Sequence, residues 1–188
     1  REGPHIQGDV LAILDDGSTD NLSEVLAPYA EKFGERFKFY KFDENRGVQE
    51  ADNQLIARCE TEFFTLLAAD DWLAPSYVEK CIMEFAKDPF LEFVASQTDF
   101  YDASGNPLPP KSNPLQSIPK AANKTRERWL FELYYGNQYF GAGMYRIGAL
   151  RQIGGIKKDF GVLCDYDVYL ALLQRENIKI VEEDLTHT

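Results

Sequence analysis

The chain has 188 residues, 44% of them hydrophobic and 27% charged, and its 31 acidic and 20 basic residues give a net charge of -11. This length provides one domain with a full core, and the composition is that of a globular protein. The negative charge and the lack of a basic stripe argue against a nucleic-acid partner. No apolar run approaches the roughly 18 residues that a membrane-spanning helix requires, so we expect no transmembrane segment.

The few cysteines and histidines indicate the compartment and exclude some kinds of site. Cys59, Cys81 and Cys164 are odd in number and lack the spacing of metal ligands, which favours a reducing compartment. We therefore expect a cytoplasmic protein, with the inner face of the membrane as an alternative location. The histidines, His5 and His187, lie near the ends of the chain, which argues against a catalytic histidine or a histidine-rich metal site.

The first predicted element is a strand over 10–14, where five apolar residues run without alternation, as in a strand buried on both faces. Asp15 and Asp16 follow at once, Gly17 allows a tight turn, and a helix is predicted over 22–33. Ligands bind at the carboxyl ends of strands in open parallel sheets. Two acids there suit a ribose hydroxyl, a base N–H or a cation better than a bare phosphate. The alternative is a strand, a turn and a capped helix without any ligand.

A second acidic pair follows a later strand. The pattern predicts, in order, a strand over 37–42, a turn over 43–47, a helix over 48–59 and a strand over 63–67. Asp70 and Asp71 come after the last of these strands. Right-handed connections place the carboxyl ends of parallel strands on one edge, so we expect all four acids to share a crevice.

Four carboxylates in one crevice are costly unless a cation or a set of sugar hydroxyls neutralises them. Mg²⁺ or Mn²⁺ holding a diphosphate fits such a site, because these ions recruit phosphate oxygens and waters as ligands. The alternative for Asp70 and Asp71 is a pair of solvated acids that lead into the next helix.

The remaining elements complete an α/β pattern. They are a helix over 76–87, a strand over 91–97, a helix over 126–135, an extended piece over 141–146, a short helix over 147–153, a helix that reaches 176 and a strand over 178–181. The proline-rich segment Asp102–Lys124 predicts a long irregular loop, functional or disordered. With no repeat or linker, we predict a single domain over 1–188. Its mostly parallel central sheet should carry helices on both faces, with the strands ending at 14, 42, 67 and 97 as neighbours.

Four stretches, taken together and in order, resemble a known enzyme family. They are VLAILDDGSTDNL from Val10, ENRGVQEADNQLIARCETEFFTLLAADDWLAPSYVE from Glu44, MYRIGALRQIGG from Met144 and CDYDVYLALL from Cys164. They are similar to family 2 of the glycosyltransferases, inverting enzymes with the Rossmann-like nucleotide-diphospho-sugar transferase (GT-A) fold. The resemblance covers most of the chain. It implies a nucleotide-binding half over 10–97 and an acceptor half over 98–188.

The resemblance implies a site for a nucleotide-diphosphate sugar, with a UDP-sugar favoured. Asp16 would bind the base, and Asp15 would support the loop or the ribose. The residues that match the turn beside the base and the helix after it are Asn45, Arg46, Gly47 and Asn53.

The same resemblance assigns the chemistry. Asp70 and Asp71 would contact the ribose and a diphosphate-bound Mg²⁺ or Mn²⁺, and Asp165 would be the catalytic base. Inverting transfer is one displacement at the anomeric carbon, so it needs a carboxylate to take the acceptor's proton and a cation to offset charge on the departing diphosphate. Asp165 is expected just before a helix, where its anionic form is favoured. Asp167 is an alternative base that we expect to cap the helix.

The acceptor would be a glycan, a lipid-linked or a small-molecule hydroxyl. We expect its side of the site to be formed by Met144–Gly155 and the loop Asp102–Lys124, mobile without ligand. Trp72 is expected either to pack against the face of an acceptor sugar or to be a partly buried core side chain. Gly141 and Gly143 are expected either to let an acceptor approach closely or to form an ordinary turn.

Three departures from the family pattern affect these expectations. Ala68 stands where the metal motif often has its first acid, and Cys164 stands where a glutamate often precedes the base. The family's usual first strand and helix have no counterpart before Val10. We therefore expect either a chain that begins inside its domain or a chain whose nucleotide binding is damaged.

Two other functions stay open. Ala68 and the missing first strand favour a non-catalytic domain of the same fold, whereas the retained acids argue against it. A sugar-phosphate nucleotidylyltransferase shares the fold style, but it requires a glycine-rich, arginine-containing phosphate loop at the amino end, which this sequence lacks.

Overall fold

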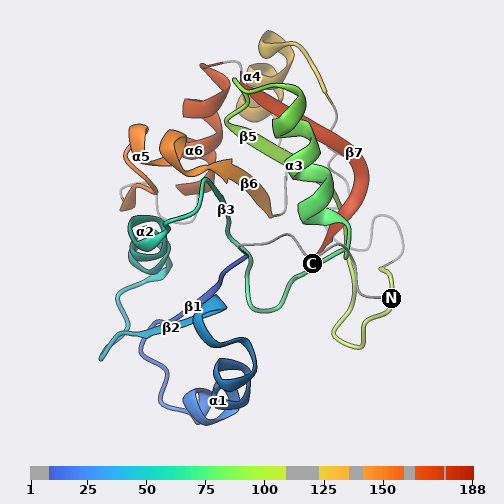
Figure 1. The fold of residues 1–188 in the computed structure, drawn as a ribbon. Coiled ribbons are helices and arrows are strands. Elements are labelled where there is room, and N and C mark those ends of the chain that lie inside the picture. Colours follow the sequence, from blue (N-terminus) through green and yellow to red (C-terminus); the bar gives the residue numbers. More distant parts are fainter. Residues whose placement is uncertain (1–8, 109–122, 136–141, 159–163, 176) are drawn as a thin grey trace.

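The structure, a computed structural model, describes residues 9–108, 123–135, 142–158, 164–175 and 177–188. The helices are α1 (Leu22–Phe33), α2 (Val48–Arg58), α3 (Tyr77–Lys87), α4 (Arg126–Tyr135), α5 (Ile147–Gln152) and α6 (Cys164–Leu173), with a 3₁₀ turn at Gly34–Arg36. The strands are β1 (Leu11–Asp15), β2 (Phe37–Lys41), β3 (Phe63–Thr65), β4 (Trp72–Leu73), β5 (Phe93–Asp99), β6 (Gly143–Arg146) and β7 (Ile178–His187). The predicted α/β order is confirmed, with β4 as an addition (Figure 1).

The strands form two sheets instead of the single sheet expected. β1 and β2 pair with each other in parallel, and the other five strands lie in the order β3-β6-β5-β7-β4. The parallel pairs β1–β2 and β5–β7 are the long ones, with five and seven paired positions, whereas each antiparallel pair has two or three. The pairing is therefore mostly, but not purely, parallel.

The prediction that the strands ending at 14, 42, 67 and 97 are neighbours is correct for β1 and β2 and wrong for β3 and β5. β6 lies antiparallel between β3 and β5 and separates them. It fits there because Gly143 has no side chain, and a Cβ atom at this position would overlap the ring of Phe93 on β5. Periodicity in a sequence identifies extended segments, but it does not say which segment pairs with which.

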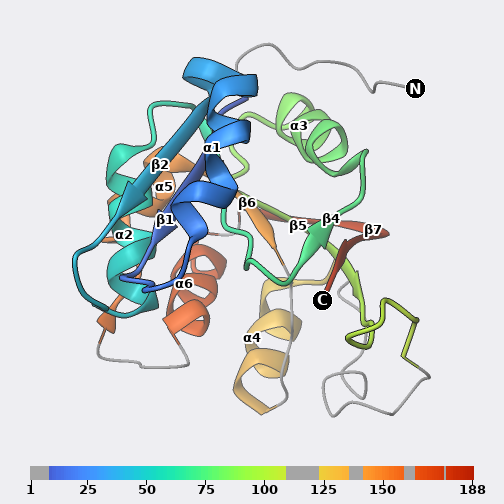
Figure 2. The ribbon, with the colours of Figure 1, turned by 90° about the horizontal axis from the view of Figure 1, so that it is seen from below.

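Helices cover both faces of the five-stranded sheet, as predicted. Successive residues of β5 point to opposite sides, as in any strand. Phe93 belongs to a core layer shared with α5 and α6, whereas Val94 packs into a second layer with Tyr77, Cys81 and Phe85 of α3. Figure 2 shows α3 on one side of this sheet and α4 and α6 on the other.

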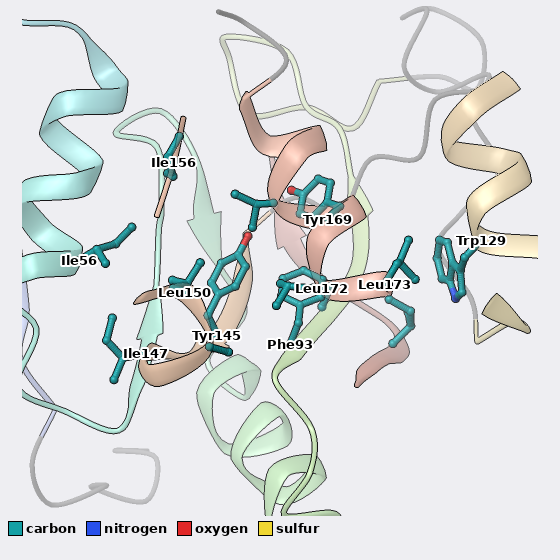
Figure 3. Close-up of a cluster of buried hydrophobic side chains, with 14 residues drawn as sticks. Ile56, Phe93, Trp129, Tyr145, Ile147, Leu150, Ile156, Tyr169, Leu172 and Leu173 are labelled. Carbon is teal, nitrogen blue, oxygen red and sulfur yellow. The ribbon is translucent and has the colours of Figure 1, made fainter. Parts of the chain in front are cut away.

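The larger of these core layers joins the elements that surround the candidate site. Its labelled side chains in Figure 3 are Ile56, Phe93, Trp129, Tyr145, Ile147, Leu150, Ile156, Tyr169, Leu172 and Leu173. The ring of Phe93 lies 4.7 Å from that of Tyr145 and 5.7 Å from that of Tyr169, between centroids. Burying a large apolar side chain contributes about 1.5–3 kcal/mol. This packing therefore fixes α6 against β5 and β6.

The first strand is less buried than predicted. Val10 and Leu11 are 47% and 55% exposed, and Asp15 is the buried residue of β1. Within the described residues β1 pairs with β2 alone, and α1 has no fully buried residue. An unbroken apolar run thus occurs here in a strand whose first residues face solvent.

The last part of the chain differs from prediction in its boundaries. α6 begins at Cys164, so Asp165 and Asp167 lie in its first turn and not before it. β7 continues to His187, well beyond 181. Residues 109–122 of the proline-rich loop lie outside the described residues, and so does the expectation for their mobility. None of the helices in the described ranges is long and apolar enough to cross a membrane.

Candidate functional site

A pocket of about 290 Å³ opens between α2, the segment that joins β3 to β4, β6 and α6. Three carboxylates line it, those of Asp52, Asp71 and Asp165. Most of the other lining side chains are apolar, and Tyr145 and Tyr169 add two phenol rings. Among the described residues, no lysine, arginine or histidine lines this pocket.

Asp165, the predicted base, lies half-buried in the first turn of α6. Its Oδ1 accepts a hydrogen bond from the Tyr166 N–H at 2.9 Å. Burial raises the pKa of Asp165, and backbone N–H groups partly offset this effect. A carboxylate with a raised pKa is a better proton acceptor near neutral pH. Asp167, the alternative, pairs with Lys157 at 2.8 Å and does not line the pocket.

Asp52 is the acid that sequence reasoning does not select. It is half-buried, and burial raises its pKa to about 6. Burial also raises the pKa of the Tyr145 phenol, and the charges of Asp165 and Asp52 raise it further, so both carboxylates lie near this ring. Asp52 comes four residues after Val48 and four before Ile56, which places it in the apolar stripe of α2. An acid in that stripe is the signal that could have identified it.

The second acidic pair is split by the structure. Asp71 lines the pocket and accepts the hydroxyl of Thr188, whereas Asp70 is exposed and does not line it. Among the residues described, no three His, Cys, Asp or Glu side chains are grouped to hold a metal ion. One or two carboxylates nevertheless fit a cation that takes its other ligands from phosphates and water. The acids present thus suit a cation that is held together with a diphosphate.

Asp15 is buried at the end of β1 and holds the loop that follows. Its Oδ1 accepts the Ser18 N–H at 2.8 Å, and its Oδ2 lies 2.8 Å from the Lys41 Nζ. Lys41 also donates to the Ser18 carbonyl at 2.7 Å. The hydrogen bonds from Lys41 and Ser18 lower the pKa of Asp15 to about 2. These contacts correspond to the loop-supporting role among the two that the sequence suggests.

Asp16 ties the loop after β1 to the loop after β2. Its Oδ1 accepts the Arg46 N–H at 2.7 Å, and its Oδ2 accepts the Gly47 N–H at 2.9 Å. The loops approach closely because Gly17 has a φ of 81°, and a Cβ there would lie 2.6 Å from the backbone of Glu44 and Asn45. A carboxylate oxygen has two lone pairs, so each can still accept a further donor such as a base N–H.

The other residues predicted to bind the nucleotide lie in two places, the loop after β2 and the helix α2. The Asn45 Oδ1 accepts the Gly47 N–H at 3.2 Å, and the Arg46 guanidinium lies 4.7 Å from the centroid of the Phe42 ring. Gly47, with a φ of 88°, is the residue before α2. Asn53 instead faces the segment after α5 and hydrogen-bonds to the backbone there.

The structure therefore separates the predicted residues into two groups. Asp71 and Asp165 lie in the pocket, and the loop residues Asp15, Asp16, Asn45, Arg46 and Gly47 do not line it. The expectation that four acids share one crevice is not met, since Asp71 is the one of the four that lines the pocket. The physical reason is the pairing of β1 with β2 in a sheet of its own.

Trp72 extends an aromatic surface beside Asp71. It is 43% exposed, and its ring lies 4.8 Å from that of Tyr101 and 5.4 Å from that of His187. The side chain is therefore not part of the core. The ring stacks on that of His187, and the exposed remainder of the indole is open to a flat ligand such as a sugar ring.

Residues 8–154 match the family model described as Glycosyl transferase family 2. The chain belongs to this family. Similar proteins include chondroitin synthase from Escherichia coli, 36% identical over 97 residues that cover 51% of this chain and 14% of that protein. The succinoglycan biosynthesis protein ExoU of Rhizobium meliloti is 32% identical over 94 residues, covering 50% of this chain and 26% of that protein. The chain thus spans about a quarter or less of these relatives' length.

Solved structures of similar shape establish the fold of this family 2 chain. Residues 1–349 of S. aureus TarS superpose with a TM-score of 0.72 at 14% identity, over 95% of this chain and 50% of that one. The mannosyltransferase PcManGT from Pyrobaculum calidifontis, solved with GDP-Man and Mn²⁺, gives 0.65 at 14% identity, over 95% of this chain and 47% of that one. The expected GT-A fold is confirmed.

Proposed function

We propose that this chain transfers a sugar from a nucleotide-diphosphate sugar, with UDP as the favoured nucleotide, to an acceptor hydroxyl with inversion at the anomeric carbon. The observation that carries the proposal is that Asp71 and Asp165 line one pocket, although 94 positions separate them in the sequence (165 − 71). Family membership supports the reaction class. The TarS fragment has been solved with UDP, which supports the choice of nucleotide.

In this proposal Asp165 is the general base. Its carboxylate takes the proton of the acceptor hydroxyl while that oxygen forms a bond to the anomeric carbon. The bond from this carbon to the diphosphate oxygen breaks in the same step, and the nucleoside diphosphate leaves with the electron pair. The raised pKa of Asp165 suits this proton transfer.

Asp71, with Asp70 beside it, would hold Mg²⁺ or Mn²⁺ against the diphosphate. The cation would offset the negative charge that grows on the leaving diphosphate. A need for it follows from the pocket itself, since three carboxylates and no lining cation among the described residues would repel a bare diphosphate. The Mn²⁺ in the GDP-Man complex of PcManGT supports a divalent ion.

The nucleotide is assigned to the loops after β1 and β2. Asp16, Asn45, Arg46 and Gly47 would receive the base and Asp15 would hold their loop, while Asn53 would act through its support of α2. We assign residues 10–97 to the donor half and 98–188 to the acceptor half of one domain. Trp72 would pack against the face of the acceptor sugar.

The acceptor is proposed to be a glycan, a lipid-linked or a small-molecule hydroxyl. The proposed location is the cytoplasm, with the inner face of the membrane as an alternative. The thiols of Cys59 and Cys81, both unpaired, suit a reducing compartment.

The second candidate is a non-catalytic domain with the same fold. It is favoured by Asp16, both of whose carboxylate oxygens already accept backbone N–H groups. A domain of this kind would keep the loops after β1 and β2 as structure only. It would neither bind nucleotides with metal dependence nor turn over a donor.

Calorimetric titration with UDP and with GDP, each with Mn²⁺ and with a chelator, tests the proposal. We expect binding of one nucleotide that weakens at least 10-fold without the cation. A parallel assay follows release of the nucleoside diphosphate from UDP-sugars and GDP-mannose over a panel of acceptors. Binding without turnover would favour the non-catalytic domain, and absence of binding to either nucleotide would contradict the proposed function.

A further inference from the structure

We propose that Asp52 is a specificity-determining residue of the pocket, which admits an uncharged, hydroxyl-rich sugar and rejects sugars that carry a carboxylate or phosphate. The inference rests on the proposed function, because it assigns the pocket to one of the two sugars of a transfer reaction. Asp52 acts here as a hydrogen-bond acceptor for sugar hydroxyls and as a like charge against anionic sugars.

The first support is the division of roles among the three carboxylates. The proposed reaction uses Asp71 beside the cation and Asp165 as the base, and it leaves Asp52 without a task. No hydrogen bond or ion pair joins Asp52 to another residue in the described ranges. A half-buried carboxylate in that position is costly unless a ligand donates to it when water is displaced. Sugar hydroxyls are such donors.

The second support is the shape and chemistry of the pocket walls. Tyr145, Leu150, Ile156 and Val168 present apolar surface, and the volume of about 290 Å³ accommodates a single sugar ring. The C–H faces of a pyranose pack on such walls while its hydroxyls reach the carboxylates. With the proposed cation on Asp71, a sugar with its own carboxylate would still meet the like charges of Asp52 and Asp165, for which the described lining offers no counter-charge.

The third support is that the backbone of α2 beside Asp52 is held in place. Its neighbour Asn53 makes two hydrogen bonds to the backbone of Ile156, at 2.7 and 2.8 Å, which tie this turn of α2 to another residue of the pocket lining. A discriminating charge needs a rigid supporting element, and these bonds hold the helix turn that carries Asp52.

The sugar in question is either that of the donor or that of the acceptor, and two arms of one experiment separate these sources. The donor arm compares UDP-glucose with UDP-glucuronate, or GDP-mannose with GDP-mannuronate if GDP binds more tightly, by calorimetry with Mn²⁺. The acceptor arm compares methyl glucoside with methyl glucuronoside at saturating nucleotide, by saturation-transfer NMR. Within each pair the sugars differ only at C6.

The variants are Asp52→Asn, which keeps the shape and removes the charge, and Asp52→Ala as a second replacement. Glu50→Gln is the matched control. It removes a carboxylate from the same helix, but Glu50 pairs with Lys158 at 2.7 Å and lies outside the pocket. Circular dichroism establishes that each variant is folded before binding is compared.

We expect the parent protein to bind the uronate at least 10-fold more weakly than the neutral sugar in one of the arms, as a like charge at close range requires. Asp52→Asn should reduce this preference about 10-fold, and Glu50→Gln should leave it unchanged. If UDP or GDP binds but both Asp52 variants keep the parent preference, or the parent has none in either arm, this inference is wrong and the proposed function stands. If neither nucleotide binds, both are wrong.

Discussion

Asn53 and Ile156 hold each other by two reciprocal hydrogen bonds. The Asn53 Nδ2 donates to the Ile156 carbonyl at 2.7 Å, and the Ile156 N–H donates to the Asn53 Oδ1 at 2.8 Å. Gly155, with a φ of 70°, lets the chain come this close, because a Cβ there would overlap the Asn53 amide. The side chain that the sequence assigns to the nucleotide therefore joins α2 to the segment after α5.

Asn53→Ala should destabilise the protein. It leaves the N–H and the carbonyl of Ile156 without their partners, which costs about 1–3 kcal/mol when such groups are partly buried. Urea unfolding measures the loss. Gln54→Ala on the same helix is the control, since the Gln54 amide makes only a 3.5 Å contact with Glu50, and it should cost less than about 0.5 kcal/mol. Equal losses for the two variants would contradict a special role for Asn53.

The Asp15–Lys41 pair should make stability depend on pH. Asp15 has a pKa of about 2 in the folded protein, below its ordinary value of 3.8, so the folded state binds its proton more weakly. The stabilisation is fully present above about pH 4 and is lost as the pH falls toward 2. Lys41→Gln should lower the free energy of unfolding by about 1 kcal/mol at pH 5.5, because Lys41 is partly exposed.

Urea midpoints between pH 5.5 and 3 follow this dependence. The difference between the parent and Lys41→Gln should shrink toward the acid end. Lys38→Gln, on the exposed side of the same strand, should follow the parent at every pH. A difference that grows as the pH falls would refute the assignment.

Asp165→Asn should abolish most transfer while donor binding persists. The amide keeps the shape and the hydrogen bond but cannot accept a proton, so turnover should fall roughly 10²-fold or more. Since burial raises the pKa of Asp165, the acid limb of the parent's pH profile should lie at a higher pH than that of an ordinary aspartate. Asp167→Asn, which loses the pair with Lys157, is the control. Parent-like turnover in Asp165→Asn would transfer the role of base to Asp167 or Asp52.

Asp71→Asn should remove most Mn²⁺-dependent nucleotide binding, because it takes away a charged oxygen ligand beside the diphosphate. Asp70→Asn should have the smaller effect, since Asp70 is exposed and lies outside the pocket. Calorimetry with and without Mn²⁺ separates the two variants. The exposed Glu79→Gln on α3 serves as the control. An unchanged affinity and metal dependence in Asp71→Asn would show that the acid is structural.

The helices follow closely from the sequence, because their boundaries are set by local signals. The sequence predicts a helix over 126–135, and α4 occupies Arg126–Tyr135. α1 ends at Phe33, just before Gly34, whose φ is 54°. Strand boundaries were harder to predict. β7 continues past 181, and its pairing with β5 skips two residues there. Ser96 pairs with Val181 and the next residue, Gln97, pairs with Asp184, so that Glu182 and Glu183 have no partner on β5. Glu182 and Glu183 thus form an irregularity within the strand.

The site was predictable in part for a similar reason. Asp71 and Asp165 stand out in the sequence because each follows or begins a recognisable element, and both line the pocket. Asp52 could not be assigned a role, because its exposure to the pocket depends on β6 and α6, which are far away in the sequence. The contact between Asn53 and Ile156 could not be predicted, because 103 positions separate the two residues. Local patterns identify polar residues, but they do not identify what those residues face.

The separate pairing of β1 with β2 has a consequence for how unfolding is observed. The layer of β1, β2 and α1 shares no strand pairing with the rest of the described structure, and α1 has no fully buried residue, so this layer should open at a lower temperature than the five-stranded sheet. The two tryptophans of the chain, Trp72 on β4 and Trp129 on α4, both belong to the other part. Their fluorescence would therefore miss the early transition that far-ultraviolet circular dichroism records, and the two methods would return different melting temperatures for one protein.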